Sequence, residues 1–303
     1  RMARQPERNL SKVSDVFDVR LKAAATAVQA HFDKILPTRP ALSVIEGMSY
    51  AVGGGKRLRA FLVLESARLH SVDPQQAIWP AAAIEAMHAY SLVHDDLPCM
   101  DDDDLRRGLP TLHVRWNEAT AVLVGDALQS LAFECVTHPE CGSAEIRVEL
   151  ARSLAIASGV QGMVLGQALD IAAETAELPL SLDEITALQV NKTGALIQWS
   201  CEAGAIMAMA DNRALRQFAQ ALGLAFQIAD DILDVEGDAS KAGKRVRKDD
   251  AAGKATFVSH LGLVGAKKRA RELVQAACDA LDGYGSEAQT LREAARFVIS
   301  RDS

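Results

Sequence analysis

The stretch Ala81-Ala82-Ala83-Ile84-Glu85-Ala86-Met87 decides the fold class, because it combines strong helix formers with almost no polar face. A helix that lacks a broad polar face is buried in a large bundle. Similar stretches recur along the chain, at residues 16–32, 60–70, 81–94, 119–136, 146–158, 182–209, 214–234, 264–281 and 287–300. No segment shows a convincing alternation of apolar and polar residues, the pattern typical of strands. The sequence therefore predicts an all-α protein.

The domain organisation follows from the breaks between these stretches. Glycine and proline interrupt them at 37 and 40, 53–55, 74, 108–110, 139–142 and 179. None of these breaks is long enough to separate two domains, so residues 1–303 are interpreted as one domain. Residues 1–10 are expected to be a flexible N-terminus. The charged, glycine-containing stretch 237–253 is the best candidate for a mobile loop.

Composition excludes several classes of partner. The 303 residues are 49% apolar and 24% charged, and 33 basic residues stand against 40 acidic ones, which gives a net charge of −7. That balance disfavours a nucleic-acid surface, which depends on a basic patch. No apolar run approaches the roughly 18 residues that a membrane span needs, so no membrane partner is expected. Five cysteines without a CxxC pair favour a reducing, cytoplasmic location.

Two aspartate clusters lie in otherwise apolar sequence, at Asp95-Asp96-Leu97-Pro98-Cys99-Met100-Asp101 and at Asp230-Asp231-Ile232-Leu233-Asp234. Asp230 and Asp234 are four residues apart, so on a helix they share one face and repel each other unless a cation lies between them. Mg²⁺ is usually held by one or two carboxylates together with substrate phosphates. The clusters therefore indicate Mg²⁺ and a phosphorylated substrate.

The first cluster needs a break in the helix. Asp95 and Asp101 are six residues apart, about 240° around an ideal helix, and could converge on one ion only if the helix ends or bends between them. Pro98 supplies that break. A calcium-binding EF-hand loop counted from Asp101 fails, because Arg106 and Leu112 stand where glycine and glutamate are required. His94-Asp95 also resembles the opening of a metal-dependent phosphohydrolase site, but no further histidines are spaced for one.

Basic groups accompany the carboxylates. Gly53-Gly54-Gly55-Lys56-Arg57-Leu58-Arg59 places free backbone donors ahead of three cations, which is a phosphate cradle in general form but not a Walker A motif. Arg106-Arg107 directly follows the aspartates at 101–104. Arginine pairs bidentately with phosphate, so two arginines beside a Mg²⁺ site suit a diphosphate. A surface network of arginine and aspartate is the alternative.

The chain resembles the short-chain trans-isoprenyl diphosphate synthases along essentially its whole length. The resemblance rests on the motifs above together with Lys192-Thr193-Gly194 and Phe226-Gln227. Within that family the chain is most similar to the bacterial farnesyl diphosphate synthases, or geranyltranstransferases. The resemblance implies one domain of antiparallel helices around a deep central cavity, usually in a homodimer. It implies Mg²⁺-dependent ionisation of dimethylallyl or geranyl diphosphate, condensation with isopentenyl diphosphate, and proton loss to give farnesyl diphosphate.

The resemblance also assigns residue roles. Three Mg²⁺ ions, for which Mn²⁺ could substitute, would be held by Asp95, Asp101 and Asp230, assisted by Asp96, Asp231 and Asp234. The allylic diphosphate would be bound by Arg106, Lys192, Thr193, Gln227, Lys244 and Lys254, and isopentenyl diphosphate by Lys56, Arg59, His88 and Arg107. The catalytic set would be Asp95, Asp101, Arg106, Lys192, Asp230 and Lys254, with no side-chain nucleophile. Asp104 and Glu85 would support the site.

Two positions depart from the family pattern. Ala60 stands where relatives usually have proline, which should affect only the start of a helix. Arg247 stands where relatives commonly have glycine, which bears on how the predicted lid closes and on the role of Lys244.

Product length is predicted from the helix that precedes Asp95. Tyr90 lies five residues earlier, about 7.5 Å along the axis at 1.5 Å per residue. Its ring, with Ser91, could form a floor that stops a fifteen-carbon chain. A geranylgeranyl diphosphate synthase would differ only in cavity depth. A class I terpene cyclase is disfavoured because its second metal motif normally differs from the one at Asp230, and a non-catalytic partner subunit because both acidic clusters are kept.

Overall fold

The computed structural model describes residues 15–36, 42–240 and 255–300. Its main helices are α1 (Asp15–Ile35), α2 (Ser43–Ala51), α3 (Leu58–Leu69), α4 (Pro74–Asp95), α5 (Leu112–Arg115), α6 (Glu118–Thr137), α7 (Ala144–Ser158), α8 (Met163–Glu174), α9 (Leu182–Gln189), α10 (Ala195–Met207), α11 (Arg213–Ser240), α13 (Phe257–Ala280) and α14 (Gln289–Ser300). Short 3₁₀ segments η1 (Pro139–Cys141) and η3 (Asp282–Ala288), a π-helical turn η2 (Val190–Gly194) and a small hairpin of β1 (Leu105–Arg106) and β2 (Leu109–Pro110) complete the described part. The predicted all-α architecture is confirmed.

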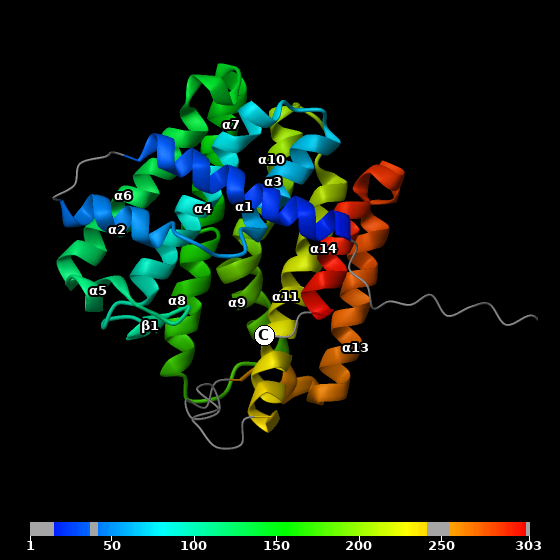
Figure 1. Ribbon diagram of the computed structural model, residues 1–303. Coiled ribbons are helices and arrows are strands. Elements are labelled where there is room, and N and C mark those ends of the chain that lie inside the picture. Colours follow the sequence, from blue (N-terminus) through cyan, green and yellow to red (C-terminus); the bar gives the residue numbers. More distant parts are fainter. Residues whose placement is uncertain (1–14, 37–41, 241–254, 301–303) are drawn as a thin grey trace, which may run out of the picture.

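The core consists of two apolar clusters, and three helices, α1, α3 and α10, contribute side chains to both. One cluster gathers α4, α6 and α7, and the other gathers α11, α13 and α14. Helices α3 and α10 pack against each other and send side chains into both clusters, and α1 lies across α3, α4 and α14 (Figure 1). A helix that faces two cores has no face left for charged residues, which explains the nearly continuous apolar character of α10.

Helix α4 begins earlier than the sequence pattern predicted. Pro74 was interpreted as a break, but it occupies the first turn of the helix, and Asp73 caps it by accepting the Gln75 N–H at 2.8 Å. Proline suits that position because its missing N–H would have no partner within the helix. Pro80 also lies inside the helix. The prediction of a helix from residue 81 was therefore too short.

Other elements were not predicted. No helix was expected at α2 or α8, and both contain a glycine, Gly47 and Gly166, at a point of close packing against a neighbouring element. The hairpin of β1 and β2 is too short to show an alternating pattern. The predicted helix 182–209 is interrupted by the π turn at 190–194.

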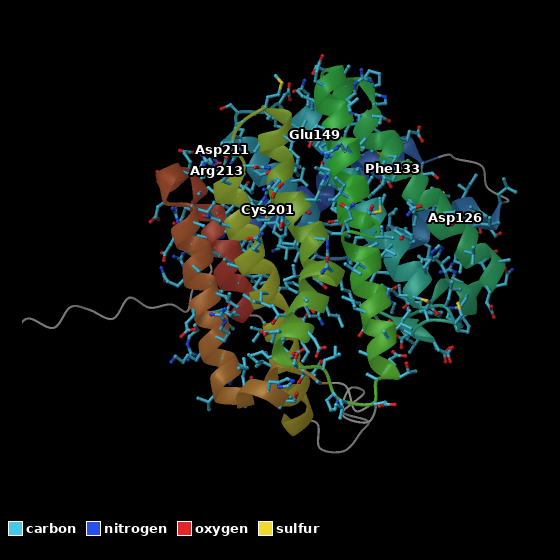
Figure 2. All side chains as sticks on the ribbon, turned by 180° about the vertical axis from the view of Figure 1, so that it is seen from behind. Asp126, Phe133, Glu149, Cys201, Asp211 and Arg213 are labelled. Carbon is cyan, nitrogen blue, oxygen red and sulfur yellow. The ribbon has the colours of Figure 1, made fainter. Side chains whose placement is uncertain are left out.

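Apolar side chains also occur on the surface of α6, α7 and α8. Two stretches, 118–137 and 144–174, are long and apolar enough to span a membrane by length and composition, contrary to the expectation from the sequence. Half of the first stretch is buried, as in the core helix of a globular protein. Asp126 and Phe133 on α6 and Glu149 on α7 mark this side of the molecule in Figure 2.

The five cysteines all lie in the described ranges, and none is in a disulfide. Cys99 is exposed and the other four are buried. Cys201 lies on α10 within the core (Figure 2). Burial raises the pKa of the Cys135 and Cys141 thiols to about 12. These two thiols are therefore kept protonated and unreactive at neutral pH.

Candidate active site

A cavity of about 510 Å³ brings the two aspartate clusters together. We call it the acidic cavity. The loop after α4 contributes one wall, α8 and η2 another, and α11 a third. Its carboxylates come from residues that are far apart in the sequence: Asp101, Asp170, Glu174, Asp230, Asp231 and Asp234.

The turn after α4 brings Asp101 back to Asp95. The helix ends at Asp95, three residues before Pro98. The Asp101 N–H then donates to the Asp95 carbonyl at 2.8 Å, and the Met100 N–H donates to the Leu97 carbonyl at 2.8 Å. The chain therefore reverses, and two residues that would lie on different sides of a helix lie side by side.

Asp95 is held at an electrostatic cost. Burial raises the pKa of its carboxyl from 3.8 to about 6. Lys192 and Arg106 oppose this shift, whereas the nearby Asp101 and Asp96 carboxylates increase it. At pH 7 the group is mostly ionised, so a half-buried negative charge is kept beside two others. Such a charge is a favourable ligand for a cation.

Asp96 and Arg106 are paired with each other. Arg106 lies on β1, and its Nε donates to both Asp96 carboxylate oxygens at 2.9 Å while Nη2 donates to Oδ1 at 2.6 Å. Asp96 is only 4% exposed. This pairing ties the hairpin to the end of α4. The metal-binding role of Asp96 and the diphosphate-binding role of Arg106 stay predictions, since either would require part of this pair to open.

Asp170 is a site residue that the sequence analysis missed. It lies on α8, lines the acidic cavity, and bonds Lys192 Nζ at 2.5 Å. Gly166, one turn earlier, allows this approach, because a Cβ there would lie 2.0 Å from the Lys192 backbone nitrogen. A signal was present in the sequence: Gln167, Asp170 and Glu174 form a polar stripe on an otherwise apolar helix.

The aspartates of the second cluster line the acidic cavity, and one of them also bonds the start of α13. Asp230, Asp234 and Gln227 line the acidic cavity from α11. Asp231 lines it too, but its Oδ2 accepts the Phe257 N–H at 2.7 Å. That N–H lies in the first turn of α13, where the backbone donors have no acceptor within the helix itself. Asp231 therefore also fixes α13 to α11 in this structure.

A second cavity, of about 400 Å³, is lined by cations, and we call it the basic cavity. Lys56, Arg57 and Arg59 reach it from the glycine turn and α3, and Arg107 from the hairpin. The Arg59 Nε is buried and has no hydrogen-bond partner among the described residues. A buried donor without a partner is costly, so the cavity is suited to an anion that would accept from it.

His88 lies in the wall of the basic cavity. Burial lowers the pKa of its imidazole well below the ordinary value, and the nearby positive charges of Arg59 and Arg107 lower it further. The ring is therefore neutral at pH 7, with one nitrogen able to donate and the other able to accept.

A third cavity, of about 580 Å³, has a mostly apolar lining and shares wall residues with each of the other two, and we call it the apolar cavity. It shares Lys192 and Thr193 with the acidic cavity and Arg59 and His88 with the basic cavity. Its remaining wall comes from α4, α6, α8 and α10 and includes Tyr90, Ser91, His94, Val122, Met163, Ala168 and Leu196.

The predicted floor residue Tyr90 lies in this apolar wall. Its ring packs edge to face on the His94 ring, with centroids 5.3 Å apart. The His94 Nε2 in turn bonds the Val122 carbonyl of α6 at 3.0 Å. Tyr90 therefore belongs to a row of side chains that joins α4 to α6. Lys244, Lys254 and most of the predicted lid 237–253 lie outside the described residues.

Known proteins resemble this chain over most of its length. The family model described as "Polyprenyl synthetase" matches residues 43–293. The chain is 47% identical to a farnesyl diphosphate synthase of Haemophilus influenzae over 86% of this chain and 89% of that protein, and 45% identical to the Escherichia coli enzyme over the same shares. A solved structure of an FPP/GFPP synthase from Zymomonas mobilis superposes with a TM-score of 0.87 at 46% identity, over 93% of this chain and 99% of that one.

Proposed function

The chain belongs to the polyprenyl synthetase family, and we propose that it is a farnesyl diphosphate synthase that condenses isopentenyl diphosphate with dimethylallyl or geranyl diphosphate. The isoprenoid synthase fold is shared with solved prenyl synthases. One observation carries the proposal: an acidic cavity and a basic cavity each share wall residues with the same apolar cavity. That arrangement suits two diphosphates and one growing hydrocarbon chain.

The acidic cavity is suited to Mg²⁺ bound together with a diphosphate. Its ligand atoms are carboxylate oxygens, which Mg²⁺ prefers. No three acidic, histidine or cysteine side chains within 15–36, 42–240 and 255–300 form a ready-made metal cluster. Mg²⁺ commonly takes only one or two carboxylates and completes its shell with phosphate oxygens and water. We therefore propose that Asp95, Asp101 and Asp230, with Asp170 from α8, hold the three expected ions when substrate binds.

The ionisation step needs fixed positive charge at the leaving group. Bound Mg²⁺ would neutralise the charge that develops on the departing diphosphate. Lys192 stands at the junction of the acidic and apolar cavities, where it can hold a diphosphate oxygen next to the breaking C–O bond. Its bond to Asp170 keeps the ammonium in place before substrate arrives. Thr193 lies beside it in the same turn.

Condensation takes place in the apolar cavity. Lys56, Arg59 and Arg107 would hold isopentenyl diphosphate by its diphosphate, so that its double bond reaches the allylic cation. The neutral His88 adds a hydrogen bond without extra charge. Apolar walls keep water away from the cation. A proton then leaves the condensed product, and the released diphosphate is its proposed acceptor.

The fifteen-carbon product is favoured by Tyr90, whose half-buried ring lies in the apolar wall about 1.4 helical turns before Asp95. A geranylgeranyl diphosphate synthase is the alternative within the same family. A terpene cyclase is disfavoured, because it would leave the basic cavity without a second diphosphate.

We also propose a homodimer. Large apolar side chains are exposed along α6, α7 and α8, among them Leu123 at 52%, Val148 at 65% and Leu169 at 39%. Large apolar side chains exposed on several neighbouring helices support a protein–protein interface on this side. Sedimentation equilibrium should give twice the chain mass, and a Val148→Glu variant should shift the protein toward the monomer. A monomeric wild type would refute this proposal.

The test of the function is direct. The purified protein is incubated with isopentenyl and geranyl diphosphates, with Mg²⁺ or with a chelator, and the dephosphorylated products are separated by chromatography. Farnesol from the Mg²⁺ sample alone is expected, and geranylgeraniol as the main product would select the alternative. Cyclic hydrocarbons, or no product with Mg²⁺, would overturn the proposal.

A further inference from the structure

An ion pair buried in the wall of the basic cavity has no part in the chemistry described above. Arg57 Nη1 lies 3.3 Å from Glu85 Oε2, and both side chains are only 6% exposed. We propose that this pair is a positioning device that aims Lys56 and Arg59 at the diphosphate of isopentenyl diphosphate. The inference rests on the proposed function, because it takes the basic cavity as the site of that substrate.

Arg57 lines the basic cavity, but both of its terminal nitrogens donate to acceptors within the protein. Besides Glu85, its guanidinium bonds the Gln29 side-chain oxygen at 3.1 Å and the Val52 carbonyl, and it stacks over the Phe32 ring at 5.6 Å. With its acceptors supplied by the protein, Arg57 is not a free ligand for a phosphate. Of the cations in the basic motif, it is the one that holds the motif in place.

The backbone at Arg57 has an unfavourable conformation, which the contacts of the Arg57 side chain hold in place. Its φ of 54° and ψ of 36° are left-handed, a conformation that is unfavourable for a residue with a side chain. This residue is the hinge between the glycine turn and α3. The three bonds of the Arg57 guanidinium compensate that cost. They therefore fix the directions in which Lys56, before the hinge, and Arg59, after it, leave the chain.

Glu85 links the same hinge to the opposite wall. Its Oε1 accepts the Ala60 N–H at 2.9 Å, one of the donors without a partner at the start of α3. Arg59 lies in that first turn, and His88 lies one turn beyond Glu85 on α4. Glu85 thus fixes the start of α3, which carries Arg59, relative to α4, which carries His88, and these two residues would bind one diphosphate.

A simpler role for Glu85 makes the opposite prediction. It is the one carboxylate among the described residues that line the basic cavity, against four cations. If Glu85 only offset their charge, replacing it by a neutral group would strengthen the binding of an anion. If it positions the cations, the same replacement would weaken that binding. The direction of the change therefore separates the two roles.

The experiment measures KM for each substrate separately, in Glu85→Gln and Arg57→Met. The glutamine can still accept from Ala60 but cannot pair with a guanidinium. We expect KM for isopentenyl diphosphate to rise about tenfold or more, and KM for geranyl diphosphate to change less than about twofold. The double variant should raise KM no further than either single variant, because the two residues act as one unit.

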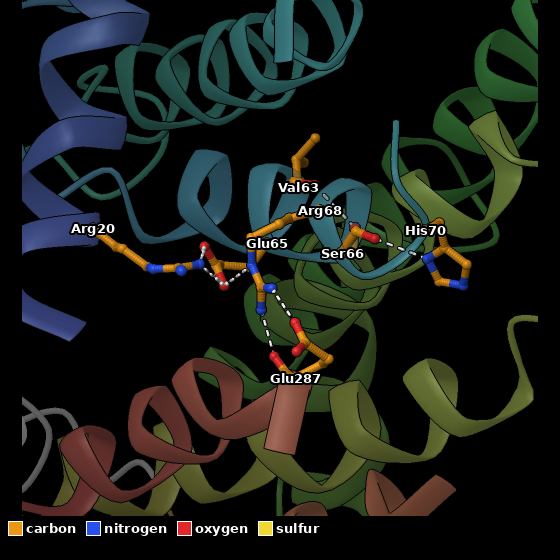
Figure 3. A network of polar contacts seen from close by, with 7 residues as sticks. All are labelled: Arg20, Val63, Glu65, Ser66, Arg68, His70 and Glu287. Atoms are coloured by element: carbon orange, nitrogen blue, oxygen red, sulfur yellow. Dashed lines mark hydrogen bonds and ion pairs between the residues drawn. The ribbon is translucent and has the colours of Figure 1, made fainter. Parts of the chain in front are cut away.

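Glu65→Gln is the matched control. Glu65 lies on α3, the helix that Arg57 precedes, and like Glu85 it is a buried carboxylate paired with arginine. Its side chain is 7% exposed, and it pairs with Arg20 at 2.9 Å and Arg68 at 3.1 Å, as Figure 3 shows. Arg68 in turn reaches Glu287 at 3.0 Å. None of these residues lines the three cavities. Glu65→Gln should lower the melting temperature, as Glu85→Gln should. Unlike Glu85→Gln, it should leave KM for isopentenyl diphosphate unchanged.

The outcomes that overturn the inference are specific. A fall or no change in KM for isopentenyl diphosphate in Glu85→Gln would refute positioning, and so would an equal rise in both KM values or an equal effect of Glu65→Gln. If Glu85→Gln does not fold, Arg57→Lys gives the same comparison, since it keeps the charge but loses the fork of donors. Calorimetry with isopentenyl diphosphate alone measures the same binding without turnover. If the wild type binds this substrate but makes no product, the proposed function is wrong, whereas the positioning role of the Arg57–Glu85 pair is still tested by the binding of the variants.

Discussion

Replacing Asp95 by asparagine should make the metal-free protein more stable at pH 8 while it removes prenyl transfer. Burial raises the pKa of Asp95 from 3.8 to about 6. Between these pH values the folded protein binds more protons than the unfolded chain does. The free energy of unfolding therefore falls as the pH rises through this window, and the full cost is present above pH 6. Asparagine carries no charge at any pH and avoids that cost.

The size of the effect follows from the same values. At 1.36 kcal/mol per pH unit, a rise from 3.8 to about 6 corresponds to about 3 kcal/mol. Asp95 is only partly buried, so solvent screening reduces this, and about 1–2 kcal/mol is expected. For a chain of 303 residues, with an unfolding entropy of about 2.1 cal/mol/K per residue, that is a rise in melting temperature of roughly 1.5–3 °C. Activity should nevertheless be lost, because a carboxylate that binds Mg²⁺ is gone.

Thermal unfolding with a chelator present, at pH 4 and at pH 8, is the measurement. The gain should be full at pH 8 and small at pH 4, where the native Asp95 is already protonated. Asp170→Asn serves as the control. It removes a carboxylate that is bonded to Lys192 at 2.5 Å, so it should lower the melting temperature at pH 8. A gain for Asp95→Asn that is equal at both pH values, or a loss at pH 8, would refute the reasoning.

Three further substitutions test other parts of the site. Asp230→Asn should reduce kcat by about a hundredfold or more with little change in melting temperature, and equal losses of both would contradict a catalytic role. Tyr90→Ala should shift the products toward geranylgeranyl diphosphate, and an unchanged product length by mass spectrometry would remove the floor hypothesis. Gly125→Ala places a methyl group 2.0 Å from His94 Nε2, so urea denaturation should show a loss of about 1–3 kcal/mol, and wild-type stability would mean that the His94 ring moves freely aside.

The sequence predicted the helices well where the apolar pattern was long, because core helices such as α4 and α10 are built almost entirely from helix-forming apolar residues. It failed where the signal was short or ambiguous. Pro74 has the same local signature at the start of a helix as in a break, and only the cap from Asp73 distinguishes the two. Helix α8 was missed because glycines precede it and one lies within it.

The acidic clusters were visible in the sequence because their members are close neighbours. Pairings between distant segments were not. Asp170 meets Lys192 across 22 residues, and nothing in either local sequence specifies the other. Arg57 was counted with the free cations of its motif, yet its acceptors come from α1 and α4 as well as from its own loop. Such contacts depend on how the helices pack, which a single sequence does not reveal.

The π turn η2 has a consequence for how this protein can vary. A π turn holds one residue more than the α-helix it interrupts, and Lys192 and Thr193 lie inside it. Loss of one residue between α9 and α10 would let this turn close into a regular helix, which moves side chains inside the turn by about 100° around the axis while the flanking helices keep their orientation. The lysine would then face away from Asp170 although its identity was unchanged. A one-residue deletion in this segment should therefore inactivate a homologue that keeps every signature residue.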